Sequence, residues 1–174
     1  PLVPLACCVS PQGFYCPPGT VDYGAFACPV GHYCLQGTLS MFQYPCPAGY
    51  YSNTVGNSAA SNCSTPCPVG RFCPTGSSDS GVPCPPGTYN PTVGGVDETQ
   101  CIACDMGTVC TVAGLSAPNA LCTPGYYCPR GTSSQVQYPC PAGTFYDYTN
   151  GTANTDCNVC PAGYGCPLGT GGFS

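Results

Sequence analysis

The sequence predicts a tandem array of small disulfide-rich modules, irregular in backbone, with short β-hairpins and almost no helix, extended into an elongated rod. Three observations predict this fold class. Cysteine supplies 19 of the 174 residues, a density typical of disulfide scaffolds. Leu, Ile, Val and Phe together supply only 27 residues, too few for an ordinary core in a chain of this length. The cysteines also recur at fixed spacings.

The first recurring motif joins two cysteines six positions apart, as in Cys28-Pro-Val-Gly-His-Tyr-Cys34. Proline fixes φ and glycine accepts positive φ, so each copy predicts a tight turn. The aromatic residue that usually precedes the second cysteine offers that turn an apolar contact. The motif recurs at Cys28–Cys34, Cys67–Cys73, Cys104–Cys110, Cys122–Cys128 and Cys160–Cys166, with a looser copy from Cys8 to Cys16.

The second motif is Pro-Cys-Pro-x-Gly, followed by another cysteine 17 positions after the first. It occurs at Cys46–Cys63, Cys84–Cys101 and Cys140–Cys157. The enclosed loops, such as 50–62 and 144–156, carry glycine and polar residues midway and predict short irregular hairpins. No segment keeps a 3.6-residue apolar period, so almost no helix is expected.

The two motifs divide the chain into modules of two lengths. Full modules with both motifs occupy 28–66, 67–103 and 122–159, and short units with the first motif alone occupy 8–27, 104–121 and the truncated 160–174. Five successive cysteines from Cys16 to Cys63 reappear 94 positions later, from Cys110 to Cys157. The modules therefore lie within a 94-residue super-repeat. Modules that contact only their neighbours would build a solenoid-like rod.

The repeat suggests a disulfide pairing, although sequence alone leaves a rival open. The favoured scheme bonds the two cysteines of each motif to each other. It leaves no unpaired cysteine in the short units, because these lack both cysteines of the second motif. This favoured scheme leaves only Cys7 over. The rival joins the second cysteine of each first motif to the next cysteine, 11 or 12 positions on, as in Cys34–Cys46 and Cys110–Cys122. It also joins each last cysteine of the second motif to the next cysteine, and it leaves Cys7, Cys8 and Cys166 over. The favoured pairs are Cys8–Cys16, Cys28–Cys34, Cys46–Cys63, Cys67–Cys73, Cys84–Cys101, Cys104–Cys110, Cys122–Cys128, Cys140–Cys157 and Cys160–Cys166.

Composition also bounds the compartment and the partners. Dense disulfides persist in oxidising surroundings, so we expect an extracellular or cell-surface protein. With two cations in the whole chain, nucleic acid is excluded as a partner, and no apolar run approaches the length of a membrane span. The expected partners are further copies of this chain or other fibre subunits, and glycans. Asn150-Gly-Thr152 is the stronger glycosylation sequon, and Asn62-Cys-Ser64 is the weaker one.

Motifs that suggest chemistry have plainer explanations here. Cys101-x-x-Cys104 and Cys157-x-x-Cys160 have the spacing of zinc or redox motifs, but each falls where two bridges meet. His32 is the single histidine, so no catalytic triad or Cys–His pair is available. The acidic pair Asp97-Glu98 is absent from the equivalent loops, which argues against a calcium site. The sequence predicts no enzyme activity, no catalytic residue, no metal site and no cofactor.

The Cys-Pro-Ala-Gly run, followed downstream by Cys-x-x-Cys-Pro-x-Gly-x-x-Cys, resembles the ephrin-receptor-like cysteine-rich repeat. The resemblance covers Cys8 to Thr170. Such repeats occur in receptor ectodomains and in long arrays on protist and algal surface proteins, including those similar to flagellar-hair (mastigoneme) proteins. The resemblance therefore implies a structural segment of a secreted, glycosylated filament or cell-surface coat. Its alternative is a receptor or adhesion stalk that binds a protein ligand.

Overall fold

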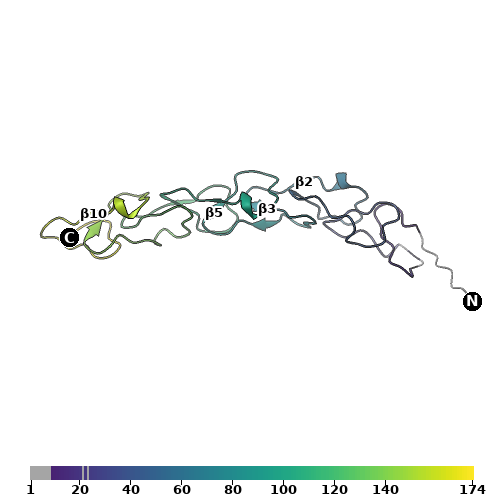
Figure 1. The fold of residues 1–174 in the computed structure, drawn as a ribbon, viewed down its shortest axis with the longest axis horizontal. Helices are drawn as coiled ribbons and strands as arrows, with labels where there is room; N and C mark the ends of the chain where they lie inside the picture. Colours follow the sequence, from purple (N-terminus) through teal and green to yellow (C-terminus); the bar gives the residue numbers. More distant parts are fainter. Residues whose placement is uncertain (1–8, 21, 23) are drawn as a thin grey trace, which may run out of the picture. The chain divides into compact units, whose positions relative to one another are not determined.

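The computed structural model describes residues 9–20, 22 and 24–174, and Figure 1 shows an irregular backbone carrying very short strands. Each strand has two residues, and the only helices among the described residues are three single 3-10 turns. The expected class, small disulfide-rich modules with short hairpins and almost no helix, is confirmed. The elements are β1 Tyr50–Tyr51, η1 Ala60–Asn62, β2 Thr65–Pro66, β3 Arg71–Phe72, β4 Val82–Pro83, β5 Thr88–Tyr89, η2 Glu98–Gln100, β6 Ile102–Ala103, β7 Thr108–Val109, β8 Ala120–Leu121, β9 Thr144–Phe145, η3 Asn154–Asp156 and β10 Asn158–Val159.

The strands pair into antiparallel hairpins of one kind. We call the residue that begins each hairpin the leading residue; it is Cys84 in the hairpin formed by β5 and β6. The residue four positions later, Thr88, pairs with Ala103, which directly precedes the next leading residue, Cys104. The same register recurs in the other paired strands and in the isolated bridges. Hairpins 1 to 8 occupy 10–27, 28–45, 46–66, 67–83, 84–103, 104–121, 122–139 and 140–159.

A glycine three positions after each leading residue makes the turn. We call it the turn glycine; in hairpin 2 it is Gly31, with φ of 74°. Its carbonyl accepts a hydrogen bond from the N–H of Cys46, the next leading residue, at 2.8 Å. All nine turn glycines have φ between 74° and 89°, where a side chain is strongly disfavoured. The turn expected from Pro-x-Gly is therefore confirmed. The turn glycines are Gly13, Gly31, Gly49, Gly70, Gly87, Gly107, Gly125, Gly143 and Gly163.

The hairpin is a smaller unit than the modules read from the cysteine motifs. A short unit contains one hairpin and a full module contains two, so the first cysteines of both motifs are equivalent leading residues. Hairpin 1 begins at Ser10, a serine where the other hairpins have cysteine. The hairpin expected within loop 50–62 is larger than predicted, because β2 lies beyond Cys63 and the loop itself holds the turn η1.

Sulfur forms most of the interior. Among the described residues, Val109 is the one apolar side chain other than cysteine in the buried core. Eight disulfides join cysteines in the described part of the chain, and each of them links two cysteines that the favoured scheme pairs: Cys28–Cys34, Cys46–Cys63, Cys67–Cys73, Cys84–Cys101, Cys104–Cys110, Cys122–Cys128, Cys140–Cys157 and Cys160–Cys166. The ninth expected pair, Cys8–Cys16, includes Cys8, which lies outside the described residues, as does Cys7.

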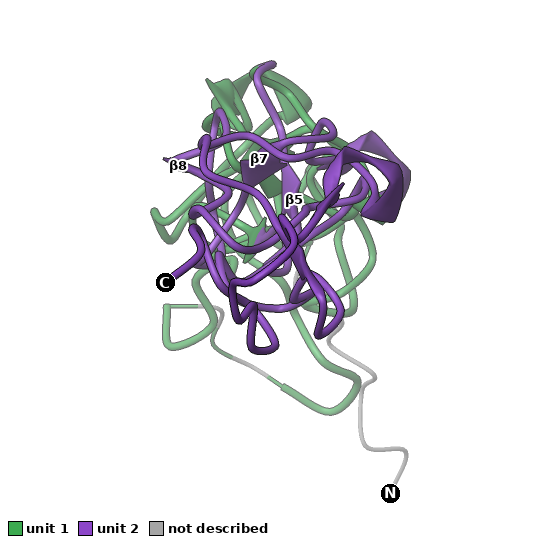
Figure 2. Ribbon diagram, turned by 90° about the vertical axis from the view of Figure 1, so that its left-hand side faces the viewer, with its two compact units in different colours: residues 1–82, 93–98 green, residues 83–92, 99–174 purple. Residues whose placement is uncertain are grey.

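The chain divides into two compact units, coloured separately in Figure 2. The first comprises residues up to Val82 together with Val93–Glu98, and the second comprises Pro83–Thr92 and Thr99–Ser174. Each unit is a succession of the same hairpins.

Candidate functional site

The feature that recurs through both units is the contact between one hairpin and the next. The turn glycine donates its N–H to the next hairpin, and the residue six positions after the leading residue does the same. In return, a second glycine of the next hairpin, which we call the distal glycine, donates to the carbonyl of the leading residue. The bonds between hairpins 2 and 3 are Gly31 N–H to Ser52 O, Cys34 N–H to Asn57 O and Gly56 N–H to Cys28 O, at 2.8, 2.9 and 2.7 Å.

The three bonds recur at seven junctions with N···O distances of 2.7 to 3.4 Å. All three use backbone atoms, so they tolerate many side chains and set a common register for successive hairpins. This explains why hairpins of different sequence and length follow one another with the same contacts. The arrangement is an inter-hairpin interface rather than a pocket.

A second contact, made by six of the turn glycines, joins a hairpin to the next but one. A Cβ placed on the turn glycine Gly49 would lie 2.7 Å from the carbonyl oxygen of the distal glycine Gly94. Such an approach is closer than any real Cβ contact, so the turn position requires glycine for space as well as for φ. The same close approach occurs at Gly13–Gly56, Gly31–Gly76, Gly87–Gly131, Gly107–Asn150 and Gly125–Gly169, at 2.2 to 2.7 Å.

Asn150 takes the place of a distal glycine in hairpin 8. Its φ of 68° makes it the one non-glycine residue with positive φ among the described residues. Asparagine tolerates this conformation better than other side chains. Its N–H donates to the Cys122 carbonyl at 3.1 Å, as the distal glycines do, while its side chain is exposed. The stronger glycosylation candidate is thus an exposed residue whose backbone takes part in the inter-hairpin interface.

Asn62, the weaker candidate, lies in the 3-10 turn η1. Its carboxamide oxygen accepts hydrogen bonds from the N–H groups of Ser58 and Ala59, at 3.0 and 2.9 Å. Asp156 does the same in η3, where its carboxylate accepts from the N–H and hydroxyl of Thr152, at 2.6 and 2.9 Å. The backbone hydrogen bond from Thr152, with that from its hydroxyl, lowers the pKa of Asp156 below 3.8. Both side chains stabilise the turn that precedes the second cysteine of a long bridge.

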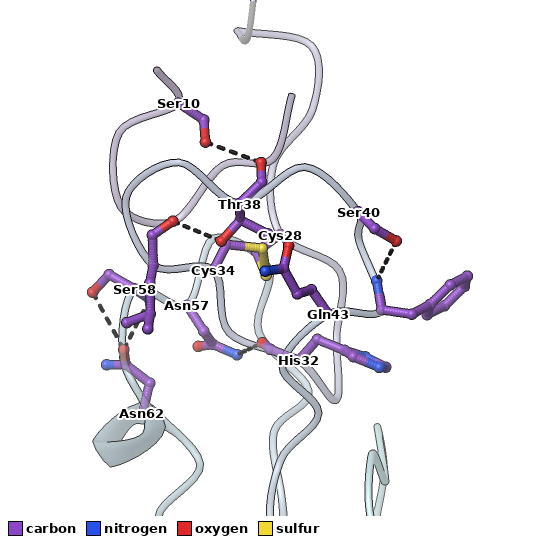
Figure 3. Close-up of a disulfide and its surroundings, with 12 residues drawn as sticks. Ser10, Cys28, His32, Cys34, Thr38, Ser40, Gln43, Asn57, Ser58 and Asn62 are labelled. Carbon is purple, nitrogen blue, oxygen red and sulfur yellow. Dashed lines mark hydrogen bonds between the residues drawn. A yellow bond between two sulfur atoms is a disulfide. The ribbon is translucent and has the colours of Figure 1, made fainter. Parts of the chain in front are cut away.

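Where a hairpin has the long bridge instead of the short one, the sixth position holds Tyr146 in hairpin 8 and a small polar side chain in the other two. Ser52 and Asn90 occupy it in hairpins 3 and 5, and both are buried. Asn57 donates to Ser52 Oγ at 3.0 Å and to the His32 carbonyl at 2.9 Å. Figure 3 shows this Asn57–His32 bond close to the Cys28–Cys34 disulfide.

The leading position of hairpin 1 is satisfied in a similar way. Ser10 is fully buried, and its hydroxyl donates to the Thr38 carbonyl at 3.1 Å, on the other side of the same disulfide in Figure 3. The sequence analysis did not predict the polar residues at the sixth position or at the leading position, because it considered only cysteines there. The signal was present, since Ser10-Pro-Gln-Gly-Phe-Tyr-Cys16 matches Cys28-Pro-Val-Gly-His-Tyr-Cys34 in its proline, glycine and tyrosine.

The cysteines of both Cys-x-x-Cys motifs are bonded in disulfides. Cys101 is bonded to Cys84, and Cys104 is bonded to Cys110, so this Cys-x-x-Cys belongs to two bridges. The same holds for Cys157-x-x-Cys160. Within the described residues, no three His, Cys, Asp or Glu side chains come together in a way that could hold a metal ion. In that same part of the chain, no helix has the length and apolar character needed to span a membrane.

His32 is half-buried in hairpin 2. Its ring contacts Phe42 edge-on at 5.3 Å between centroids, and its Nδ1 lies 3.2 Å from the Val30 carbonyl.

The chain matches no protein-family model, and no curated protein matches it. Its disulfide density is typical of extracellular, secreted cysteine-rich proteins.

Proposed function

We propose that this chain is a structural repeat segment of a secreted, glycosylated extracellular filament or cell-surface coat. The observation that carries the proposal is the inter-hairpin interface, which repeats the same three backbone bonds from hairpin to hairpin. A repeat whose contacts depend on backbone atoms can be extended by adding copies, and its length then follows from copy number. A fibre or coat protein needs this property, and an extended rod is its expected form.

Surface chemistry supports assembly with further chains. Many large apolar side chains are exposed, and the chain has two cations against seven acidic residues. A surface with so little charge offers weak repulsion between neighbouring copies. The most exposed of these side chains are Val9, Phe42, Val55, Val93, Met106, Tyr148, Val159 and Leu168. We propose that some of them supply lateral contacts to copies of this chain or to other fibre subunits.

Glycosylation at Asn150 would suit the same role. Asn150 is exposed while its backbone N–H takes part in the interface, so we expect a glycan there to leave the hairpin contacts intact. Glycans would keep a sparsely charged surface hydrated. Asn62 is less suited, because its amide group already holds the turn η1.

Electron microscopy of native material tests the proposal directly. The expected result is polymers with an axial repeat that corresponds to a whole number of hairpins. Dispersed monomers at physiological concentration would contradict it.

The alternative is a cysteine-rich stalk of a receptor or adhesion ectodomain, as the resemblance implies. The same hairpin stack would serve as a spacer that holds a binding domain away from the cell surface. Its test is binding: a soluble fragment that captures one protein ligand tightly and forms no polymer supports the stalk and contradicts the filament.

A further inference from the structure

Two tyrosine pairs recur at equivalent positions of the super-repeat. Tyr33 and Tyr44 stack with ring centroids 5.5 Å apart and an interplanar angle of 23°. Tyr127 and Tyr138, 94 positions later in the sequence, stack at 5.7 Å and 28°. In each pair the first tyrosine directly precedes the second cysteine of a short bridge, and the other lies two positions before the next leading cysteine.

The backbone and a glutamine hold each pair in the same way. The N–H of Tyr33 donates to the Tyr44 carbonyl at 2.9 Å. Gln43 donates to the Tyr44 hydroxyl at 3.1 Å, and its own side-chain oxygen accepts from the Leu39 N–H at 3.1 Å. The second ring is therefore fixed from both ends, because its backbone and its hydroxyl are each hydrogen-bonded.

The second copy repeats these bonds. The N–H of Tyr127 donates to the Tyr138 carbonyl at 2.9 Å, and Gln137 donates to the Tyr138 hydroxyl at 3.1 Å. Two rings that are already stacked and held in place lose little further freedom when they are joined, which lowers the entropic cost of the reaction. All four tyrosines are partly exposed, so they are open to oxidation from solvent.

We propose that Tyr33–Tyr44 and Tyr127–Tyr138 are sites of oxidative phenol coupling, each forming a dityrosine within one chain. The oxidant is hydrogen peroxide acting through a haem peroxidase. Each phenol loses one electron and one proton, and the two phenoxyl radicals join through the ring carbons next to the hydroxyl-bearing carbons. One C–C bond forms, two C–H bonds break, and one hydrogen peroxide is reduced to two water molecules.

The link would bridge a part of the chain that no described disulfide crosses. Cys28–Cys34 closes one loop and Cys46–Cys63 closes the next, while the connection from Cys34 to Cys46 is held by backbone hydrogen bonds. A Tyr33–Tyr44 bond would join the Cys28–Cys34 loop covalently to the end of this connection, two positions before Cys46. Hairpin 1 offers a natural contrast, because its equivalent pair is Tyr15–Phe26, with centroids 5.5 Å apart, and Phe26 lacks the hydroxyl that the reaction needs.

The sequence allows each link to be read by one cleavage. Arg130 lies between Tyr127 and Tyr138, and Met41 lies between Tyr33 and Tyr44. The folded chain is treated with the peroxidase and peroxide, and its monomer fraction is then isolated, reduced and alkylated. Trypsin cuts one portion at arginine. Cyanogen bromide cuts the other at methionine, after any methionine sulfoxide has been reduced.

The expected result is that residues 72–130 stay attached to 131–174 after trypsin, and 1–41 to 42–106 after cyanogen bromide. Tyr138→Phe should abolish the first attachment alone and Tyr44→Phe the second alone, each halving the dityrosine fluorescence. Release of the fragments from the oxidised wild-type chain would overturn the proposal. So would attachment that persists in the phenylalanine variants, or equal coupling in a chain unfolded by reduction before oxidation. Because the links lie within one chain, the result does not depend on whether that chain forms filaments.

Discussion

Hairpins 2 and 3 are closed by different disulfides but have the same frame. In hairpin 2 the leading Cys28 bonds to Cys34 six positions later, and in hairpin 3 the leading Cys46 bonds to Cys63, 17 positions later. The Cα–Cα distances are 5.7 and 5.5 Å. The turn glycines, register and interface bonds correspond. The difference between them is at the sixth position, where hairpin 3 has Ser52.

This comparison separates two roles that the cysteine pattern combines. Glycine and backbone hydrogen bonds determine how hairpins follow one another, while the disulfide determines how each hairpin is closed. A hairpin can therefore exchange a short bridge for a long one and keep the same interface bonds, whether the sixth position holds Ser52, as in hairpin 3, or Tyr146, as in hairpin 8. The long bridge needs an added 3-10 turn, which Asn62 stabilises in hairpin 3 and Asp156 in hairpin 8.

Reduction of all disulfides should have the largest effect, because it removes both kinds of closure. The interior is built mostly from cysteine, so little apolar burial remains to offset the chain entropy. We expect complete loss of structure, measured as loss of hydrogen-exchange protection at the turn-glycine amides. A reduced chain that keeps this protection would show that the backbone frame is stable without either bridge.

Removal of one bridge at a time should show which kind, short or long, contributes more to the free energy of unfolding. In the chain-entropy estimate a short bridge contributes about 2.4 kcal/mol and a long one about 3.2 kcal/mol. The double variant Cys46→Ala/Cys63→Ala should therefore be less stable than Cys28→Ala/Cys34→Ala, as measured by denaturant midpoint and local hydrogen exchange. All four side chains are buried, so the packing loss is matched. A larger loss for the short bridge would contradict the ranking.

Alanine substitutions at two turn glycines should distinguish the cost of a steric clash from the cost of positive φ. Gly49 and Gly143 share the sequence Cys-Pro-Ala-Gly and have φ of 86° and 85°. A Cβ on Gly49 would meet the Gly94 carbonyl oxygen, whereas one on Gly143 has nothing within 4 Å.

Both alanine variants lose about 1–2 kcal/mol from positive φ, and Gly49→Ala should lose about 1–3 kcal/mol more from overpacking. Denaturant unfolding measures the difference. Equal losses would mean that the contact between alternate hairpins contributes nothing.

Acidification should distinguish the turns of the two long-bridge hairpins, with the smallest effect. The pKa of Asp156 is lowered in the folded chain, so its contribution is complete above pH 3.8 and is lost as pH falls through the folded pKa. Hydrogen-exchange protection factors, which compare each amide with the unfolded chain at the same pH, should then fall at Thr152 and Ala153. Asn62 carries no charge, so exchange at Ser58 and Ala59 should not change in this way. Asp156→Asn should abolish the pH dependence; a variant that keeps it would assign the effect to another group.

Sequence reasoning could reach the fold class because it depends on local spacing, and it reduced the disulfide pairing to two schemes. Pro-x-Gly specifies the turn by itself but not the length of the bridge, because Cys28 and Cys46 begin the same turn and bond to cysteines six and 17 positions later. The common hairpin could not be reached from cysteines alone, since Ser10 and Ser52 keep the frame without sulfur. The contact between Gly107 and Asn150 could not be predicted either, because it joins backbone atoms of residues far apart in sequence. In addition, asparagine stands there at the position of a distal glycine.

The pairing scheme is the central claim, and one cleavage without reductant tests it. Met41 lies between Cys34 and Cys46. The chain is used with its disulfides intact and without peroxidase treatment. If each hairpin is closed by its own bridge, cyanogen bromide should release residues 1–41 from it. Residues 42–106 should stay attached to 107–174 through Cys104–Cys110. If residues 1–41 stay attached and separate only on reduction, Cys34 is bonded to Cys46 and the account is wrong.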